Sequence, residues 1–482
     1  MITQTTNYSY AQLREHSDKL ADLIADISTS RPRISLLCDD PFETAALSFA
    51  IARLDGVCIP VNSQMMPEQL LQGWKDTDTT IVFYDDAQKK KVAALKGKGP
   101  LFICTNDLES HHSSENNEQA WQGSDDFLIT LSSGSTGAPK PIVISQTVKL
   151  KRAEQAWRMY ELCADDIILC ASPFFHSLGQ RLVFTPLLLG ATCVHIHPFT
   201  PAKWIEAVHQ HKVTYTTSVS SHLYALKDQL LKQASKIKSL KTIVTSSAPI
   251  DVHFKEQFFQ EVGCDFHEIY GATEIACATN LYPRFKAEKY STVGHACENV
   301  EIRILDDNGQ DVPPNSIGEI AVKSPLRFEE YYKKPELTQK SFQDGFFKTG
   351  DLGFMDKNFF LSYVSRKKDV IICGGINIYP EDIENVLSEL DILKEIAVIG
   401  VKDSLLGEVI VAICVADIPC ERELRKIANQ QLAPFQRPLK YFFVSSLPLT
   451  PSGKLSKQAL RDEYTPQNTD WTMALRALLY GK

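Results

Sequence analysis

The stretch LSSGSTGAPK, from Leu131 to Lys140, has the residue types of an anion-binding loop. It places hydroxyl side chains, glycines and a lysine between two apolar runs, FLIT and IVIS. Backbone N–H groups and hydroxyl groups of such a loop converge on an anion, and the lysine adds positive charge. The stretch therefore predicts a phosphate-binding loop between two strands, although an exposed turn has a similar composition. It is not a Walker A loop, because its spacing differs and a proline precedes the lysine.

Four more segments with chemically useful residues follow toward the C-terminus. They are EIYGATE (Glu268–Glu274), FKTGDLGFMD (Phe347–Asp356), SRKKDVIICGGINIYPEDIE (Ser365–Glu384) and LPLTPSGKLSKQALR (Leu447–Arg461). With the first loop, in this order, they resemble the motifs of the AMP-forming, acyl-activating ligases, which include acyl-CoA synthetases, adenylation domains of peptide synthetases and beetle luciferases. The resemblance extends over nearly the whole chain.

The resemblance implies a reaction in two steps. A carboxylate attacks the α-phosphorus of ATP and releases pyrophosphate, and the acyl group then passes to a pantetheine thiol. ATP, Mg²⁺ and either CoA or phosphopantetheine are the expected cofactors and acceptor. Two unit negative charges at about 4 Å repel by roughly 4 kcal/mol at an effective dielectric of about 20, so cations and oriented donors are needed.

The resemblance also implies which residues contact the nucleotide. Glu274 matches the magnesium ligand of the family, with Thr136 beside it, and one carboxylate suits a hard cation that keeps most of its waters. Tyr270 would present its ring face to adenine, and Gly271 would let the backbone approach closely. The residues expected to contact ATP or AMP are Ser132, Ser133, Gly134, Ser135, Thr136, Gly137, Lys140, Ser247, Ala248, Pro249, Glu268, Ile269, Tyr270, Gly271, Ala272, Thr273, Asp351 and Arg366.

Three charged residues of the second half of the chain receive roles in the same way. Asp351 and Arg366 match the pair that holds the ribose hydroxyls, and a carboxylate readily accepts from two cis hydroxyls. Lys454 matches the catalytic lysine that bridges the carboxylate, the α-phosphate and a ribose oxygen. The residues expected to act in catalysis are Lys454, Thr136 and Glu274.

Gly374 and Gly375 resemble the hairpin that lines the pantetheine tunnel in the second step. A small rigid domain cannot turn both this hairpin and Lys454 toward one site if they lie on different sides. The domain is therefore expected to pivot, and the family pivots about the residue that matches Lys368.

The chain departs from the usual family pattern at three positions. Pro141 and Ser365 stand where glycines are usual, and Lys348 stands where arginine is common. None of these changes removes a catalytic group, so they concern loop geometry and not the class of reaction.

The segment SPFFHSLGQRLVFTPLLLGATCVHI, Ser172–Ile196, resembles the one that enters the acyl pocket. Relatives that activate amino acids have an aspartate there, because a buried ammonium needs an anionic partner. His176 at that position disfavours an α-amino acid and favours a hydrophobic fatty or aryl acid, although it also suits an ordinary core histidine. The expected pocket residues are Phe175, His176, Gly179 and Ala276, with Cys277 alongside.

The elements that position these residues are expected to form an α/β fold. Between residues 33 and 270, short β-branched runs alternate with amphipathic stretches, as in RISLLC before FETAALSFAIARL. This alternation is typical of βαβ units and of parallel sheets covered by helices. The length of 482 residues implies more than one domain.

We expect a large N-terminal adenylate-forming domain and a small, mobile α+β domain. The first would span residues 1–365 and become β-rich from residue 292, where Asp307-Asn308-Gly309 predicts a hairpin. The second, a C-terminal lid, would span residues 366–482 with its hinge near Lys368.

Composition restricts the partners and the compartment. A formal net charge of −8 argues against nucleic acid as the main partner, because basic surfaces hold phosphate backbones. The 12 cysteines have neither CxxC nor paired His/Cys spacing, which suits a reducing compartment. No stretch has the pattern of a signal peptide or of a transmembrane segment, so the cytoplasm is the expected location.

Three functions are compatible with the sequence. The favoured one is an acyl-CoA synthetase, and the second is an adenylation enzyme that loads an acyl or peptidyl carrier protein. Free CoA and carrier arms share the same thiol end, so the glycine hairpin does not separate them. The third is an inactive relative that acts as a binding module, which the retention of Glu274, Asp351, Arg366 and Lys454 disfavours.

Overall fold

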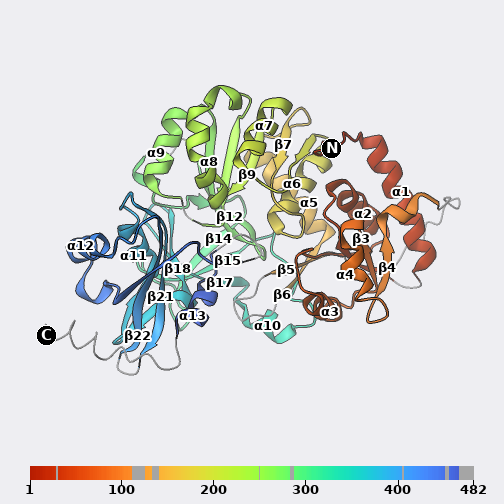
Figure 1. Ribbon diagram of the computed structural model, residues 1–482. Helices are drawn as coiled ribbons and strands as arrows, with labels where there is room; N and C mark the ends of the chain where they lie inside the picture. The colour runs from red at the N-terminus through yellow and green to blue at the C-terminus, as the bar shows by residue number, and fades with distance from the viewer. Residues whose placement is uncertain are drawn as a thin grey trace. The chain divides into compact units, whose positions relative to one another are not determined.

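The computed structural model describes residues 1–28, 31–110, 125–132, 140–248, 250–282, 287–403, 406–450 and 455–465 (Figure 1). The chain divides into two compact units, and each is described by itself. One comprises residues 1–302 and 322–347, and the other comprises residues 303–321 and 348–482. The boundary predicted between residues 365 and 366 falls inside the second unit and stays a prediction.

The first sheet of unit 1 is built from the apolar runs near the N-terminus. Its six strands have the order β4-β3-β1-β2-β5-β6, and all pairs are parallel except β5 with β6. The elements are α1 (Tyr10–Ile27), β1 (Arg33–Leu37), α2 (Pro41–Arg53), β2 (Val57–Pro60), α3 (Pro67–Asp76), β3 (Ile81–Tyr84), η1 (Asp86–Gln88), α4 (Lys89–Ala93), β4 (Leu101–Cys104), η2 (Thr105–Ser110), β5 (Asp126–Ser132) and β6 (Lys140–Ser145).

Helices of this region begin where the sequence supplies capping groups. The Asp40 carboxylate accepts hydrogen bonds from the first backbone N–H groups of α2, and Pro41 occupies the first helical position. Ser9 and Gln12 form a capping box at the start of α1. Local sequence therefore determines where these helices start.

The second sheet of unit 1 has the order β13-β12-β11-β10-β9-β7-β8. It is parallel from β8 to β11 and antiparallel at β12 and β13. The elements are α5 (Gln146–Met159), β7 (Ile167–Cys170), α6 (Ser177–Leu189), β8 (Thr192–His195), α7 (Pro201–His211), β9 (Tyr215–Val219), α8 (Ser220–Lys232), η3 (Ala234–Ile237), β10 (Thr242–Ser246), α9 (Val252–Glu261), β11 (Asp265–Ala272), β12 (Ala276–Leu281), η4 (Ala287–Lys289) and β13 (His295–Ala296).

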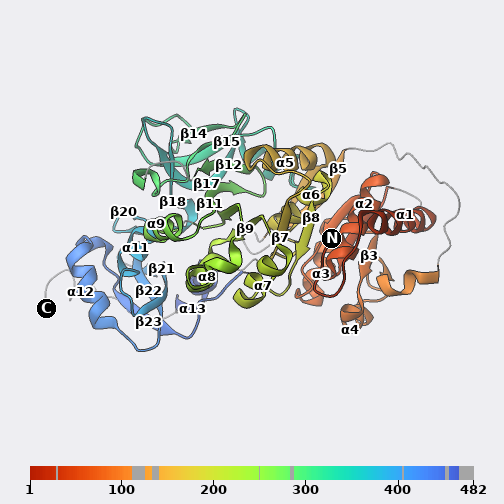
Figure 2. The ribbon, with the colours of Figure 1, turned by 90° about the horizontal axis from the view of Figure 1, so that it is seen from above.

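The two faces of this second sheet differ in character. Ile243 and Phe266 are in register on one face, which packs with α7, α8 and α9 into an apolar core. Val244 and His267, one position along, are in register on the opposite face, where α6 packs. Figure 2 shows α5 and α6 on one side of β7 and β9 and α7 and α8 on the other. The sheet therefore has one apolar face and one face with polar side chains.

A third sheet has the order β14-β15-β17-β16, with β18 paired to β17. Its elements are β14 (Glu301–Leu305), β15 (Gly318–Lys323), α10 (Pro335–Lys340), β16 (Phe342–Gln343), β17 (Phe346–Met355) and β18 (Leu361–Arg366). The hairpin predicted at residues 307–309 forms a tight turn, in which the N–H of Gly309 donates to the carbonyl oxygen of Asp306 at 3.0 Å.

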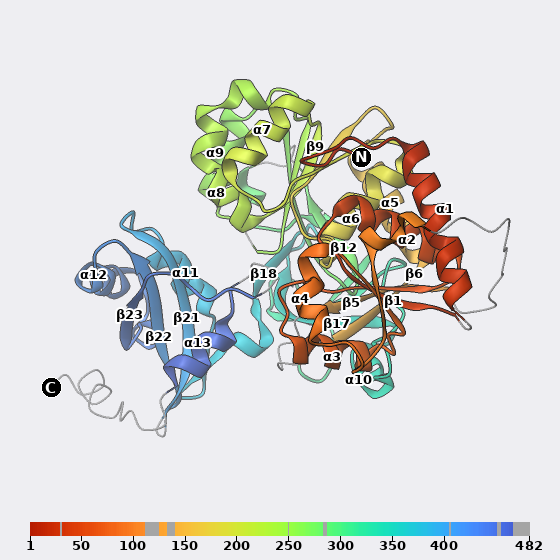
Figure 3. The ribbon, with the colours of Figure 1, turned by 45° about the vertical axis from the view of Figure 1, so that its right-hand side comes forward.

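The C-terminal part of unit 2 is an α+β structure around a sheet of order β20-β19-β22-β21, with β23 parallel to β22. Helices α11 and α12 pack on one face of this sheet and α13 on the other (Figure 3). The predicted α/β class is thus confirmed. The elements are η5 (Lys367–Asp369), β19 (Ile371–Cys373), β20 (Ile376–Ile378), α11 (Pro380–Leu387), β21 (Leu393–Asp403), β22 (Gly407–Ala416), α12 (Glu421–Gln431), η6 (Pro434–Gln436), β23 (Lys440–Val444) and α13 (Lys457–Tyr464).

Within the described ranges, no helix combines the length and the apolar character needed to cross a membrane.

Candidate active site

Predicted site segments of unit 1 lie at one edge of the seven-stranded sheet. His176 lies between β7 and α6, Ser247 and Ala248 follow β10, and residues 270–272 end β11. Because β7, β10 and β11 run parallel, their carboxyl ends meet at the same edge. Open α/β sheets bind ligands outside this edge. The fold therefore brings together segments that are far apart in the sequence.

The turn that follows β11 depends on a glycine. Strands β11 and β12 pair with a bulge between Tyr270 and Gly271, and a Cβ on Gly271 would lie 1.9 Å from the carbonyl oxygen of Ala276. No side chain fits there, so the turn that carries Thr273 and Glu274 requires glycine at this position. Tyr270, predicted to stack on adenine, is 8% exposed.

The end of β10 has a strained backbone. Ser247 adopts a φ of 89°, a backbone conformation that residues other than glycine rarely adopt. The hydroxyl of Ser220 donates to the carbonyl oxygen of Ser246 at 3.2 Å and also to that of Ala248, and these bonds hold the bend. Such strain at the carboxyl end of a central strand is typical of a functional turn.

Glu274 is held through both its side chain and its main chain. Its Oε1 accepts a hydrogen bond from the Tyr331 hydroxyl at 2.8 Å, and its carbonyl oxygen accepts from the N–H of Phe328 at 2.6 Å. The buried Arg152 donates to the carbonyl oxygen of Leu326 at 2.7 Å and to that of Glu274 at 3.4 Å. Burial, followed by the Glu274 charge, raises the pKa of Tyr331, so its hydroxyl stays protonated and donates.

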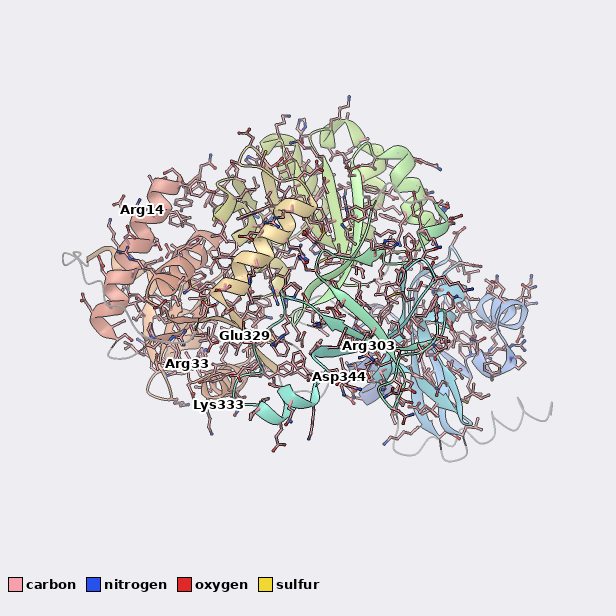
Figure 4. All side chains as sticks on the ribbon, turned by 180° about the vertical axis from the view of Figure 1, so that it is seen from behind. Arg14, Arg33, Arg303, Glu329, Lys333 and Asp344 are labelled. Carbon is pink, nitrogen blue, oxygen red and sulfur yellow. The ribbon has the colours of Figure 1, made fainter. Side chains whose placement is uncertain are left out.

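The segment of residues 326–334 connects Glu274 to the start of β6. Tyr331 forms a β-bridge with Ile142, and Nζ of Lys140 lies 5.2 Å from the centre of the Tyr331 ring. Lys140 and Glu274 therefore contact the same tyrosine, one at its ring and one at its hydroxyl. Figure 4 locates this segment by its labelled residues Glu329 and Lys333.

Two predicted residues have structural contacts that their motifs do not indicate. Glu268 is 2% exposed, forms an ion pair with Lys255 and accepts from the N–H of Ile250 at 3.0 Å. Burial raises the pKa of Glu268. Its carboxylate is therefore engaged inside the protein, and only its main chain remains for the predicted nucleotide contact. A Cβ on Gly179 would lie 2.0 Å from the carbonyl oxygen of Pro173, so Gly179 lets α6 pack against the preceding turn.

The other predicted acyl-pocket residues flank the same sheet edge. His176 is the N-cap residue of α6, and its carbonyl oxygen accepts from the N–H of Gln180 at 3.0 Å. The rings of Phe175 and His176 have centroids 4.2 Å apart. Ala276 lies at the start of β12, next to the buried Cys277.

Asp351 and Arg366 meet within unit 2. They are register partners on β17 and β18, and Nε of Arg366 forms an ion pair with Oδ1 of Asp351 at 2.7 Å. The Asp351 side chain is 4% exposed, whereas that of Arg366 is 47% exposed. Burial, followed by the charge of Asp351, raises the pKa of Tyr363. The strand pairing therefore brings the two residues together, and their role in holding the ribose hydroxyls stays a prediction.

Gly374 and Gly375 form the two-residue turn between β19 and β20, with φ of 58° and 80°. Positive φ at both positions is typical of a type I′ hairpin and favours glycine. Lys368 lies in η5, and the adjacent Asp369 accepts a 2.8 Å hydrogen bond from Arg461 of α13. The predicted hinge is therefore next to an ion pair within the same unit.

Part of the predicted site lies outside the described residues, and the roles of that part stay predictions. This applies to the side chain of Ser132 and to Ser133, Gly134, Ser135, Thr136, Gly137, Pro249 and Lys454.

Sequence reasoning missed Tyr331 and Arg152. Neither residue belongs to a recognised motif, and both reach Glu274 only because β6 and residues 326–334 lie side by side. For Arg152, the only signal would have been its place on the buried face of helix α5, because a buried guanidinium needs hydrogen-bond acceptors.

Comparisons with known proteins match both halves of the chain. The model of the AMP-binding enzyme family matches residues 1–332, and that of the AMP-binding enzyme C-terminal domain matches residues 382–454. Indoleacetate–CoA ligase of Aromatoleum aromaticum is 30% identical over 478 residues, which are 94% of this chain and 92% of that protein.

Two further similarities bear on the acceptor and the nucleotide. The fatty acid–[acyl-carrier-protein] ligase ScoC of Streptomyces coeruleorubidus is 26% identical, over 96% of this chain and 93% of its own. The structure of O-succinylbenzoate coenzyme A synthetase (MenE) from Bacillus subtilis, in complex with ATP and magnesium ion, superposes with a TM-score of 0.87. It is 27% identical and covers 96% of each chain.

Proposed function

This chain belongs to the AMP-binding enzyme family, and we propose that it joins a carboxylic acid to AMP and then to the thiol of CoA. The observation that carries the proposal is the contact of Lys140 and Glu274 with one tyrosine, Tyr331. Through it, the end of the predicted phosphate loop lies near the predicted magnesium ligand. This is the arrangement that ATP with a bound cation requires.

The proposed first step forms one bond and breaks one. A carboxylate oxygen of the acid bonds to the α-phosphorus, and the bond from that phosphorus to the bridging oxygen of pyrophosphate breaks. Lys140 and Lys454 would offset the charge on the phosphates. The ribose hydroxyls would donate to the buried carboxylate of Asp351, which Arg366 orients.

A divalent cation fits the residues at Glu274. One carboxylate oxygen is held by Tyr331, which fixes the side chain, and the other suits Mg²⁺, which prefers oxygen ligands and retains waters. Bound Mg²⁺ would neutralise phosphate charge. The proposed roles of Thr136 and Glu274 in holding it follow from the family resemblance.

In the proposed second step, the thiol sulfur attacks the acyl carbon, loses its proton, and AMP leaves. CoA is the favoured acceptor because the indoleacetate–CoA ligase is similar along the chain. The similarity to a ligase named for acyl-carrier protein supports a second candidate, a carrier-bound phosphopantetheine. The acid is proposed to have an apolar body, since Phe175 and Cys277 flank the site. A cytoplasmic location stays a prediction.

Exchange of labelled pyrophosphate into ATP tests the first step. The purified protein, with Mg²⁺, is offered fatty, aryl and amino acids one at a time, and thioester formation is then measured with CoA and with a holo carrier protein. We expect exchange with aryl or fatty acids, none with amino acids, and thioester formation on CoA. Thioester on the carrier alone would establish the second candidate. No exchange with any acid would contradict the proposed function and revive the binding-module alternative.

A further inference from the structure

Two buried cysteines of unit 1 lie close enough to react with each other. Cys277 is in β12 and Cys297 follows β13, both are free thiols, and their sulfur atoms are 3.5 Å apart. The N–H of Cys297 donates to the carbonyl oxygen of Ala278 at 2.8 Å, so the backbones beside the two thiols are paired. A disulfide has an S–S bond of about 2 Å, and the sulfur atoms would need to approach by about 1.5 Å to form it.

The two thiols differ in how readily they lose a proton. A hydrogen bond from the Cys297 thiol, aided by the charge of Arg181, lowers the pKa of Cys277, although burial opposes this. The same hydrogen bond, together with burial, raises the pKa of Cys297. By contrast, burial raises the pKa of Cys170 to about 12. Because the thiolate is the reactive form of cysteine, Cys277 is the nucleophile of the pair and Cys297 is its partner.

Burial restricts which oxidants suit this pair. Cys277 is 0% exposed and Cys297 is 7% exposed. A bulky disulfide such as oxidised glutathione is therefore too large to approach either sulfur in the folded chain, whereas hydrogen peroxide is close to water in size. Peroxide oxidises thiolates, so it is the class of oxidant that fits both the burial and the chemistry of the pair.

The pair adjoins the turn that carries the predicted magnesium ligand. Cys277 is the register partner of Gly271, on the turn side of the bulge between β11 and β12. A Cβ on Gly271 would lie 1.9 Å from the carbonyl oxygen of Ala276 and 3.2 Å from the Cα of Cys277, so the two backbones are already in close contact. Ala276 has a φ of 60°. Because packing this close transmits displacements, a shift of Cys277 would also move residues 272–276, which include Glu274.

We propose that Cys277 and Cys297 form a reversible disulfide in response to peroxide, and that this bond slows adenylation by displacing the turn after β11. The disulfide is independent of the proposed function, and only its effect on adenylation rests on that function. In the reducing compartment predicted for this chain, disulfides are usually transient and serve redox sensing, which agrees with a pair whose thiols are free in the structure.

The oxidation consists of two successive displacements. The Cys277 thiolate attacks one oxygen of hydrogen peroxide, the O–O bond breaks and hydroxide leaves, which gives a sulfenic acid. The sulfur of Cys297 then attacks the sulfur of Cys277 and loses its proton, and the sulfenic hydroxyl group leaves as hydroxide. The two protons lost by the thiols convert both hydroxides to water. The cysteines thus lose two electrons and peroxide gains them, and a dithiol reductant reverses the bond by thiol–disulfide exchange.

Mass spectrometry of the oxidised protein tests the disulfide without any activity assay. The reduced protein is treated with hydrogen peroxide, its remaining thiols are alkylated after denaturation, and its peptides are analysed. We expect two peptides joined through Cys277 and Cys297, with a combined mass lower by two hydrogen atoms. The exposed Cys163 is the internal control, because its oxidation shows that enough peroxide was present. Oxidation of Cys163 without linkage of Cys277 to Cys297 would overturn the inference.

Pyrophosphate exchange after the same treatment tests the effect on adenylation. Peroxide should lower the exchange rate of the wild type and of Cys163→Ala about tenfold or more, since a misplacement of about 1 Å can lower a rate by about 100-fold. Cys297→Ala and, as a second variant of similar size to the wild type, Cys297→Ser cannot form the disulfide and should keep their rates. Dithiothreitol should restore the rate of the oxidised wild type.

Three results would overturn the regulatory role and leave the proposed function intact. They are an equal loss of rate in the wild type and in both Cys297 variants, linkage of the two cysteines without loss of rate, and a loss that dithiothreitol does not reverse. Absence of exchange with every acid before oxidation would contradict the proposed function and its regulation, and the peptide analysis would still decide whether the disulfide forms.

Discussion

The hydroxyl of Tyr331 donates a 2.8 Å hydrogen bond to the carboxylate of Glu274. The two residues are 57 positions apart, and the bond forms because the segment after β15 lies beside β6. It fixes one oxygen of the predicted metal ligand and places the ring of Tyr331 near Lys140. A tyrosine that no motif identifies thus connects two motifs that the proposed reaction needs.

Replacement of this tyrosine tests that connection. Tyr331→Phe should lower the adenylation rate about tenfold and raise the Mg²⁺ concentration needed for half-maximal rate, because a hydrogen bond to a charged group is lost. Pyrophosphate exchange against Mg²⁺ concentration measures both effects. Tyr332→Phe is the matched control, since Tyr332 donates to the exposed Asp78 at 2.8 Å. Equal rates in the two variants would show that the bond to Glu274 has no part in the reaction.

The turn after β11 should not tolerate a methyl group. Gly271→Ala should lower the free energy of unfolding by about 3 kcal/mol or abolish exchange, because its Cβ would meet the carbonyl oxygen of Ala276 at 1.9 Å. Gly263→Ala is the control, since a Cβ there meets no atom within 4 Å. Denaturant unfolding measures the difference. A fully stable and active Gly271→Ala would mean that the bulge is not needed in its described form.

The predicted catalytic lysine should act in the first step only. In Lys454→Ala, acyl-AMP formation should fall about 100-fold or more, as expected when a charge-stabilising donor is lost. Thioester formation from preformed acyl-AMP should be much less affected. Lys402→Ala, an exposed lysine in β21, is the control. Equal losses in both steps of a folded Lys454→Ala would contradict the assigned role.

A substitution at the predicted hinge should give the opposite pattern to Lys454→Ala. Lys368→Pro should leave adenylation intact and abolish thioester formation, because proline fixes φ in η5 and prevents the pivot. Lys368→Ala removes the same side chain without fixing φ, so it should retain both steps. Separate assays of pyrophosphate exchange and of CoA consumption test this. Loss of both steps to the same extent in Lys368→Pro would refute a hinge at this residue.

The sequence predicts the α/β fold well, because the patterns that determine its strands and helices are local. Short β-branched runs became parallel strands, and Asp351 and Arg366 became partners because consecutive strands of a hairpin pair directly. The bond between Tyr331 and Glu274 and the ion pair of Glu268 with Lys255 depend on contacts between segments distant in sequence. The spacing of apolar and polar residues along the chain contains no information about such contacts.

Oxygen-isotope transfer tests the central claim most directly. The enzyme is supplied with ATP, Mg²⁺, CoA and an acid whose carboxylate carries ¹⁸O, and the products are analysed by mass spectrometry. If the carboxylate attacks the α-phosphorus and AMP later leaves with the shared oxygen, AMP should contain one ¹⁸O atom and pyrophosphate none. Label in phosphate or pyrophosphate, or acid-dependent formation of ADP in place of AMP, would contradict the account.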